Sequence, residues 1–467
     1  MLFSSISFLY FFLPAVLLLY AIAPKVLKNT VLLVSGLVFY AWGEPKYVVI
    51  MVISILVGYV FGLLIERFKE NKKLSRLFMI LSVGVDLGLL IYFKYVDFFI
   101  ENFNAATGLG IPLLRIALPI GISFYTFQIL SYTVDVYRGD VPAQKNPINL
   151  GAYITMFPQL IAGPIVRYSD VERELRERKH SIEKVSQGII RFCVGFGKKI
   201  LIANALGELC DNFKGTDEKT VLFYWLYAVG FSLHIYFDFS GYSDMAIGLG
   251  KIFGFTFMEN FNYPYISKSV TEFWRRWHMS LGQWFRDYVY IPLGGNRVSL
   301  LKHLRNIFIV WFLTGFWHGA DWNFIVWGLY FAVLLTLEKL WLGKYLKKSK
   351  VLSRVYVLFL IVISFVIFNA AGMGEAIQYI GGMFGVGVSG FAGAEWLYNL
   401  RSYAFIFVVA AIGATPIPKL IVGKINENKA GNIICSILSP VFAAVIIILC
   451  TAYLVDGSFN PFLYFRF

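Results

Sequence analysis

The sequence predicts an all-α polytopic membrane protein, with the whole chain, residues 1–467, forming one integral-membrane domain. Hydrophobic residues make up 58% of the chain and charged residues only 15%, whereas an ordinary soluble domain carries about a quarter charged residues. The mean hydropathy is +0.67. Apolar runs long enough to cross about 30 Å of hydrocarbon recur throughout. Segments of this length satisfy their own backbone groups in lipid only as helices.

The apolar runs define the expected spans. They are Leu2–Ala23, Val31–Tyr40, Tyr47–Ile65, Val221–Phe237, Ile325–Leu337 with its flanks, Val355–Phe368 and Ile433–Leu454. With further transmembrane or re-entrant segments between them, we expect about ten to twelve helices in the membrane. The first run has neither a basic leader nor a small-residue cleavage site, so we expect it to be a retained span.

The basic residues indicate the orientation of the chain, because cytoplasmic loops collect Lys and Arg. They gather in Lys25/Lys28, Arg67–Arg76, Arg167–Lys184, Lys339–Arg354 and Lys419–Lys429. Placing all of these in the cytoplasm puts Ala370–Leu400 and the C-terminal tail, residues 455–467, outside the cell. Orientation toward membrane lipid thus accounts for the net charge of +14, and no nucleic-acid partner is expected.

Two apolar segments are not expected to cross the membrane. Gly151–Val166 contains Pro158, Gly163 and Pro164, which is typical of a re-entrant segment shielded by protein. In Val270–Gly295 the aromatic residues repeat at three-to-four spacing, while Arg and Asp fall elsewhere. This pattern predicts one amphipathic helix that lies in the interface or lines a cavity.

His318 is the first candidate catalytic residue. It lies within the apolar and aromatic run WFLTGFWHGADWNFIVWG, where an ionisable group is costly unless it faces a cavity or a partner. The alternative is a structural histidine bonded to a neighbouring helix. His180 and His303 lie in strongly basic stretches, and we expect both to be solvated surface residues.

His278 is the second candidate. On the predicted amphipathic helix it lies on the same side as Trp274 and Leu281. A polar group beside a general base could orient it or stabilise an oxyanion. An imidazole suits proton transfer from a hydroxyl because its unperturbed pKa is about 6.5. An interfacial residue among aromatics is the alternative.

A third set of polar residues lies in FSLHIYFDFSGYSDMAIGLG, which places His234 and Asp238 on one helical face, followed by Asp244. They could form the proton relay of a transporter or a buried structural pair. The cysteines have neither disulfide nor zinc spacing, so no metal site is expected. Complete phosphate-loop, serine-hydrolase and zinc-protease motifs are missing from the sequence.

The C-terminal sequence FNPFLYFRF is aromatic to its last residue, whereas unstructured termini are normally polar. It could anchor at the lipid headgroups. Alternatively, the tail docks into the protein and offers Tyr464 as a hydroxyl nucleophile activated by a nearby base.

Two long motifs resemble the membrane-bound O-acyltransferase family, in particular its bacterial alginate and peptidoglycan O-acetyltransferases. They are TEFWRRWHMSLGQWFRDYVYIPLGGNR (Thr271–Arg297) and FWHGADWNFIVWGLYFA (Phe316–Ala332). The resemblance implies a multi-pass protein of the bacterial cell membrane, with helices around a central tunnel. It also implies that His318 and His278 are the two family histidines.

The resemblance extends to substrates and partners. In teichoic acid D-alanylation a small separate protein carries a tail pattern that Phe462–Phe467 matches, which implies that Tyr464 is an acyl relay. The implied donor is acetyl-CoA or an acyl carrier protein thioester, with no tightly bound cofactor. An extracytoplasmic partner, of the SGNH-esterase-like or alginate-acetylation type, would pass the group to a polysaccharide. A proton-coupled transporter or flippase for a lipid-linked glycan is the competing class, and a non-catalytic scaffold a third.

Overall fold

The computed structural model describes residues 3–456 and 462–463. These residues form helices and no β-sheet; an isolated bridge joins Thr220 to Gly390. The chain divides into two compact units, Met1–Phe192 with Met245–Met258, and Cys193–Asp244 with Glu259–Phe467. The division falls within two long helices, α9 (Ile182–Gly197) and α11 (Val221–Ile252).

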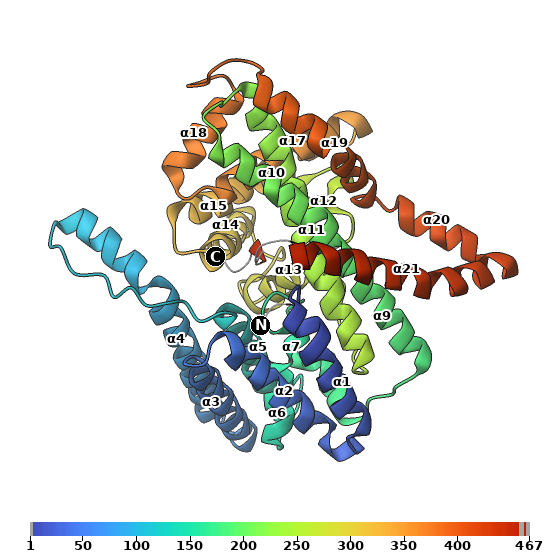
Figure 1. Ribbon diagram of the computed structural model, residues 1–467. Coiled ribbons are helices and arrows are strands. Elements are labelled where there is room, and N and C mark those ends of the chain that lie inside the picture. Colours follow the sequence, from blue (N-terminus) through green and yellow to red (C-terminus); the bar gives the residue numbers. More distant parts are fainter. Residues whose placement is uncertain (1–2, 457–461, 464–467) are drawn as a thin grey trace. The chain divides into compact units, whose positions relative to one another are not determined.

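The first unit contains the N-terminal helices (Figure 1). They are a π-helical turn Phe8–Phe12, α1 (Leu13–Ile22), α2 (Lys28–Gly43), α3 (Val48–Arg67), α4 (Lys72–Thr107), α5 (Ile122–Arg138), α6 (Pro147–Thr155), α7 (Phe157–Leu160) and α8 (Tyr168–Arg176). Helix α3 packs against both α4 and α5. Gly58 and Gly62 of α3 face Ile129 and Tyr132 of α5 so closely that a Cβ would collide. Small residues of this kind let membrane helices approach each other.

The predicted re-entrant segment does not form a continuous helix. Helix α6 ends at Thr155, Met156 interrupts it, and the short helix α7 gives way to irregular backbone. All residues from 150 to 166 are buried. The Tyr153 hydroxyl donates to the Val166 carbonyl at 2.9 Å, so irregular backbone is satisfied within the protein, as membrane-embedded loops require.

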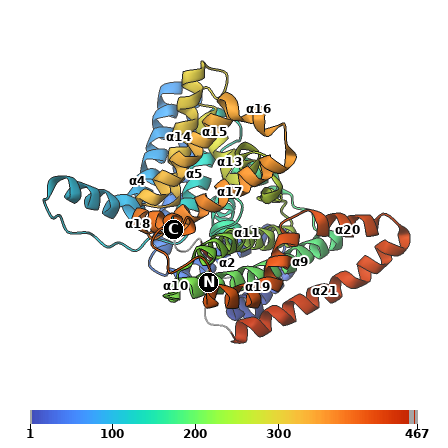
Figure 2. The ribbon, with the colours of Figure 1, turned by 90° about the horizontal axis from the view of Figure 1, so that it is seen from above.

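The second unit contains most of the remaining helices. They are α10 (Asn204–Gly215), α12 (Val270–Trp274), α13 (Met279–Phe285), α14 (Leu300–His318), α15 (Trp322–Leu337), α16 (Gly343–Leu346), α17 (Lys350–Asn369), α18 (Met373–Met383), α19 (Ala394–Gly413), α20 (Ile417–Asn426) and α21 (Lys429–Asp456). Helices α14 and α15 lie side by side (Figure 2). They pack closely because Gly315 and Gly328 face each other's backbone without side chains.

Eight helices among the described residues are long and apolar enough to cross a membrane. They are Lys25–Gly43, Val48–Arg67, Lys72–Thr107, Val221–Ile252, Trp322–Leu346, Lys350–Asn369, Ala394–Gly413 and Lys429–Asp456. The apolar helix Phe8–Ile22 is shorter. The fold is therefore the predicted all-α polytopic membrane protein.

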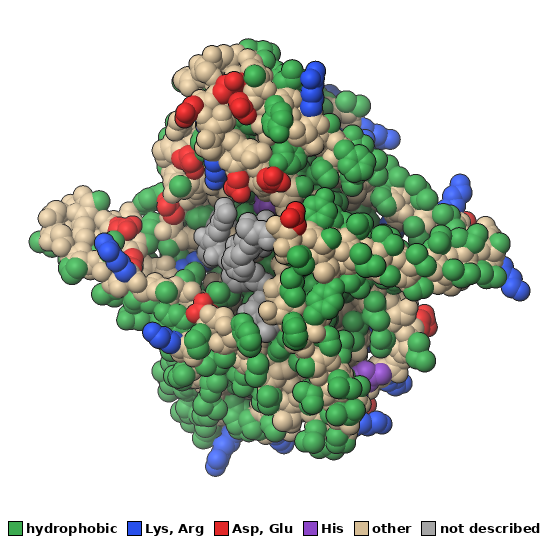
Figure 3. Space-filling model, viewed as in Figure 1, with side chains coloured by type: hydrophobic (Ala, Val, Ile, Leu, Met, Phe, Trp, Pro, Cys, Tyr) green, Lys and Arg blue, Asp and Glu red, His purple; other side chains and the backbone are tan. Residues whose placement is uncertain are grey.

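The surface of these helices is itself apolar. On α21, large side chains such as Ile437 and Ile448 are more than half exposed. Hydrophobic side chains cover much of the face shown in Figure 3. Exposed apolar surface on this scale is rare in soluble monomers, and here it is the surface that lipid covers.

Candidate active site

His318 is the last residue of α14, and its side chain is buried. Its ring centroid lies 5.1 Å from that of Trp327 on α15 and 5.1 Å from that of Phe368 on α17. Both neighbouring rings stand at 84° to the imidazole. Side chains from two neighbouring helices thus pack against an ionisable ring inside the protein, as an intramembrane site requires.

His278 enters the same aromatic cluster from another segment. The Trp317 ring centroid lies 4.9 Å from that of His318 and 6.2 Å from that of His278. The imidazole of His278 also contacts Phe239 of α11, at 4.7 Å between centroids, and is 2% exposed. The structure therefore brings both predicted histidines against one indole.

The predicted single amphipathic helix across Val270–Gly295 is wrong. Helix α12 ends at Trp274, α13 starts at Met279, and a π-helical turn, Arg286–Tyr290, follows. His278 lies at the break with φ 44° and ψ 53°, in the left-handed region. Only a few per cent of non-glycine residues adopt a positive φ, although His is enriched among them.

Hydrogen bonds from Asn260 hold this break. Its carbonyl accepts from Met279 N at 2.9 Å, and its Oδ1 accepts from the backbone N and hydroxyl of Ser280 at 3.2 and 2.9 Å. The Asn260 amide in turn donates to Ser243 of α11 at 3.0 Å. These bonds offset the cost of about 1–2 kcal/mol for a left-handed residue, so the direction of His278 is set by tertiary contacts and not by a helical stripe.

Burial also determines the charge of His278. Loss of hydration lowers the pKa of His278 to about 3, because a buried imidazolium is costly. The ring is thus neutral at physiological pH. A neutral imidazole can donate one hydrogen bond and accept another, which suits oxyanion stabilisation without a net charge.

The sequence placed His234, Asp238 and Asp244 in a possible proton relay. In the structure Asp238 Oδ1 pairs with Lys199 Nζ at 2.5 Å, and Asp244 pairs with Lys198 at 2.7 Å. His234 Nδ1 lies 2.5 Å from the carbonyl oxygen of Ala203. Each carboxylate has its own lysine from the π-helical turn Lys198–Ala203, and this arrangement favours the structural alternative.

Two described residues of the tail, Phe462 and Leu463, lie against the protein. Phe462 and Leu463 are 1% and 6% exposed. Leu463 N donates to Asp238 Oδ2 at 3.0 Å, and the Phe462 ring contacts Tyr242 at 4.6 Å between centroids. These two residues are therefore covered by protein and do not themselves anchor in lipid headgroups. Tyr464 lies outside the described residues, and its relay role stays a prediction.

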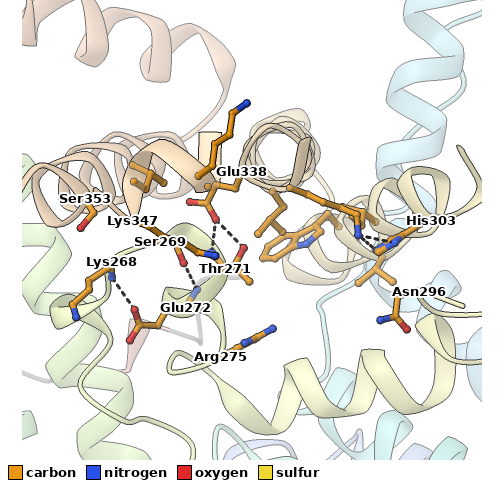
Figure 4. Close-up of a pocket in the computed structure, with 18 of the residues that line it drawn as sticks. Lys268, Ser269, Thr271, Glu272, Arg275, Asn296, His303, Glu338, Lys347 and Ser353 are labelled. Atoms are coloured by element: carbon orange, nitrogen blue, oxygen red, sulfur yellow. Dashed lines mark hydrogen bonds between the residues drawn. The ribbon is translucent and has the colours of Figure 1, made fainter. Parts of the chain in front are cut away.

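A cavity of about 1110 Å³ opens in the second unit (Figure 4). Its cationic lining residues are Lys268, Arg275, Lys339, Lys344, Lys347 and Lys350. The two carboxylates in the lining are already engaged. Glu338 accepts from Val270 N and Thr271 N at 2.6 and 3.0 Å, and Glu272 pairs with Arg276 at 2.9 Å. The cavity therefore presents a surplus of positive charge to a ligand.

His303 belongs to the wall of this cavity, so its prediction as a solvated residue is wrong. Its side chain is 8% exposed, and its ring bonds to the Tyr290 hydroxyl at 2.9 Å and to Lys339 Nζ at 2.8 Å. His303 does not lie in a solvated loop but in the first turn of α14, which begins at Leu300. His180 is exposed, as predicted.

Comparison with known proteins decides the family. The model of the membrane-bound O-acyltransferase family matches residues 87–381, which include both histidines. The chain belongs to this family. It is therefore a membrane-embedded acyltransferase, and the fold and the enzyme class predicted from the two histidine motifs are confirmed.

Similar proteins narrow the position of this O-acyltransferase within the family. The chain is 39% identical to a probable alginate O-acetylase of Pseudomonas putida over 100% of both sequences. It is 34% identical to a peptidoglycan O-acetyltransferase of Helicobacter pylori, covering 83% of this chain and 81% of that protein. A teichoic acid D-alanyltransferase of Bacillus subtilis is 34% identical over 46% of this chain and 58% of its own length.

Proposed function

We propose that the protein moves an acetyl group from a cytoplasmic thioester to a hydroxyl of an extracytoplasmic polysaccharide in a bacterial cell membrane. The observation that carries the proposal is the convergence of two buried histidines on one indole. The activities for which the similar proteins are named, alginate and peptidoglycan O-acetylation, support the acceptor class.

His318 acts as the general base in this proposal. It removes the proton of the attacking hydroxyl while the hydroxyl oxygen forms a bond to the thioester carbonyl carbon. As the tetrahedral intermediate collapses, the C–S bond breaks, and the proton returns from His318 to the departing thiolate. The products are an ester and a free thiol. Neutral His278 donates a hydrogen bond to the oxyanion, where such groups have their largest effect.

The basic cavity binds the anionic part of the donor. Its lysines come largely from the stretch Lys339–Arg354, which the charge distribution predicts to be cytoplasmic. Acetyl-CoA and the prosthetic group of an acyl carrier protein both carry phosphate, which such a basic cluster attracts. Acetyl-CoA brings more negative charge, and six cations in the lining favour it.

Tyr464 supplies the first hydroxyl, and an extracytoplasmic partner of the SGNH-esterase-like or alginate-acetylation type then collects the acetyl group. A phenol has a pKa near 10, so at neutral pH it needs a base to become a good nucleophile. The burial of Phe462 and Leu463 supports a tail that reaches the protein interior. The outward orientation of the C-terminus belongs to the same proposal.

The proposal is tested with purified protein, radiolabelled acetyl-CoA and a hydroxyl-bearing acceptor. We expect one free thiol to be released for each acetyl group found as an ester, and mass spectrometry of trapped enzyme to find acetyl on Tyr464. A transporter or a scaffold would release no thiol. Full polysaccharide acetylation by Tyr464→Phe would exclude the relay, because that variant keeps the ring and lacks the hydroxyl.

A further inference from the structure

The ion pair between Lys199 and Asp238 is unusually deep. The Lys199 and Asp238 side chains are 0% and 2% exposed. Removing two charges from water costs more than a simple pair recovers unless further hydrogen bonds satisfy the charged atoms. Asp238 makes such a bond, because one of its oxygens accepts from Lys199 and the other from the backbone N–H of Leu463.

Side chains around the pair complete a binding site for the tail. The Lys199 ammonium lies over the Phe462 ring, 4.6 Å from its centroid, and Tyr242 meets the same ring edge-on at 84°. A desolvated cation over an aromatic face is attracted to it. We call Lys199, Asp238 and Tyr242 the tail-docking site. It contacts both Phe462 and Leu463.

The tail-docking site and Leu463 are neighbours, in sequence or in packing, of residues that contact the histidines. Asp238 is followed in α11 by Phe239, whose ring contacts His278 at 4.7 Å. Leu463 also packs into the same buried cluster as Trp327 and Phe368, the residues whose rings contact His318. The next residue in the sequence after Leu463 is Tyr464.

We propose that Lys199 and Asp238 are positioning residues for the C-terminal tail. Their pair binds the Leu463 N–H and the Phe462 ring, and this anchoring delivers Tyr464 to the transfer site. The docking itself stands independently of the reaction. The positioning role rests on the proposed relay by Tyr464. Docking and positioning are therefore measured in separate experiments.

Docking is tested by photo-cross-linking in the full-length protein. A p-benzoylphenylalanine at position 462 should cross-link to the α11 peptide that contains Tyr242. Leu463→Pro should lower the yield at least fivefold, because proline has no backbone N–H to donate to Asp238. Leu463→Ala keeps that N–H and serves as the control. No cross-link to α11, or equal yields from the Pro and Ala variants, would overturn the docking.

The ion pair is tested by removing both charges at once. Lys199→Gln/Asp238→Asn leaves no unpaired buried charge, so it avoids the most damaging effect of single substitutions. We expect it to reduce the cross-link at least threefold. The matched control is Lys198→Gln/Asp244→Asn, the neighbouring and more exposed pair, at 23% and 10%. Equal losses in both variants, or no loss in the first, would contradict a specific role of Lys199 and Asp238.

Positioning is read from steady-state kinetics of the same variants. Leu463→Pro should lower kcat for acceptor acetylation at least tenfold and leave KM for the donor within twofold, because donor binding does not involve the tail. A general structural defect would change both constants. Loss of the cross-link with unchanged kcat would leave the docking in place and overturn the positioning role, whereas the relay itself is overturned only by full acetylation in Tyr464→Phe.

Discussion

The histidine cluster and the basic cavity lie in the same compact unit, but they are built from opposite kinds of side chain. The rings that contact His318 and His278 in the described part of the chain include those of Trp317, Trp327, Phe368 and Phe239, which are uncharged. The cavity wall carries six cations and two carboxylates with hydrogen-bonded partners.

This difference separates two tasks of an acyltransferase. Proton transfer and oxyanion stabilisation are strongest where water is excluded and hydrogen-bond donors are held in place by the protein. Binding of an anionic donor needs charge at an accessible surface. This division predicts that substitutions in the histidine cluster change kcat and that substitutions in the cavity change KM for the donor.

After His318 itself, the largest effect in this comparison is expected from His278→Gln. Removing one oxyanion donor typically costs about 10²–10³ in kcat, and KM for the donor should not change. His180→Gln, at an exposed histidine, is the control. A variant that instead raised KM with a normal kcat would assign His278 to donor binding.

Asn260→Ala should have the next largest effect, because it removes the side chain that holds the break at His278. Two bonds to Ser280 and one to Ser243 are lost, and buried groups left without partners cost about 1–3 kcal/mol. We expect kcat to fall about tenfold along with stability. The control is Asn399→Ala, an equally buried asparagine, which should reduce stability and leave kcat unchanged. An equal loss of kcat in Asn260→Ala and Asn399→Ala would show that Asn260 affects stability and has no specific role in placing His278.

A smaller effect is expected from Lys344→Ala/Lys347→Ala in the cavity. Exposed charge pairs are worth about 0.2–1 kcal/mol each, so KM for the acetyl donor should rise about three- to tenfold and kcat should stay constant. Raising the salt concentration should weaken donor binding by the parent protein more than donor binding by the variant. Lys419→Ala/Lys424→Ala removes the same charge from exposed positions of α20. Equal KM values for the donor in the two variants would show that the cavity does not bind the donor specifically.

The smallest effect concerns pH. His278 has a folded-state pKa of about 3, below its unfolded value of about 6.5, so the unfolded chain binds the extra proton between these values. Stability should therefore fall as the pH drops from 6.5 toward 3, and this contribution should be absent from His278→Gln. Thermal unfolding at pH 7.5 and 5.0 measures it. An identical acid dependence in parent and variant would contradict a buried neutral imidazole.

The fold class could be predicted from the sequence, because a membrane span is recognised from a local run of apolar residues. Apolar runs such as Tyr47–Ile65 and Val355–Phe368 became α3 and α17. His318 could also be found, since an ionisable side chain in an apolar and aromatic run is energetically costly unless it faces a cavity or a partner. Helix α4 was harder to recognise, because Asp86, Lys94 and Asp97 interrupt its apolar residues.

Features that depend on distant contacts could not be predicted from local patterns. Periodicity placed His278 on a helical stripe, but Asn260 turns the backbone there. Charge pattern made His303 a surface residue, although Tyr290 and Lys339 bury it. Lys199 within the otherwise apolar stretch after Lys198 was a usable signal, because a lysine beside an apolar run needs a partner, but the sequence does not show that Asp238 is that partner.

The central claim is that His318 moves a proton during ester formation. The most direct measurement compares acetyl transfer by the purified parent and by His318→Ala, with binding of a non-transferable acetyl-CoA analogue measured in parallel. We predict a loss of about 10²–10⁴ in kcat with donor binding unchanged within twofold. Transfer at the parent rate by His318→Ala would contradict the account.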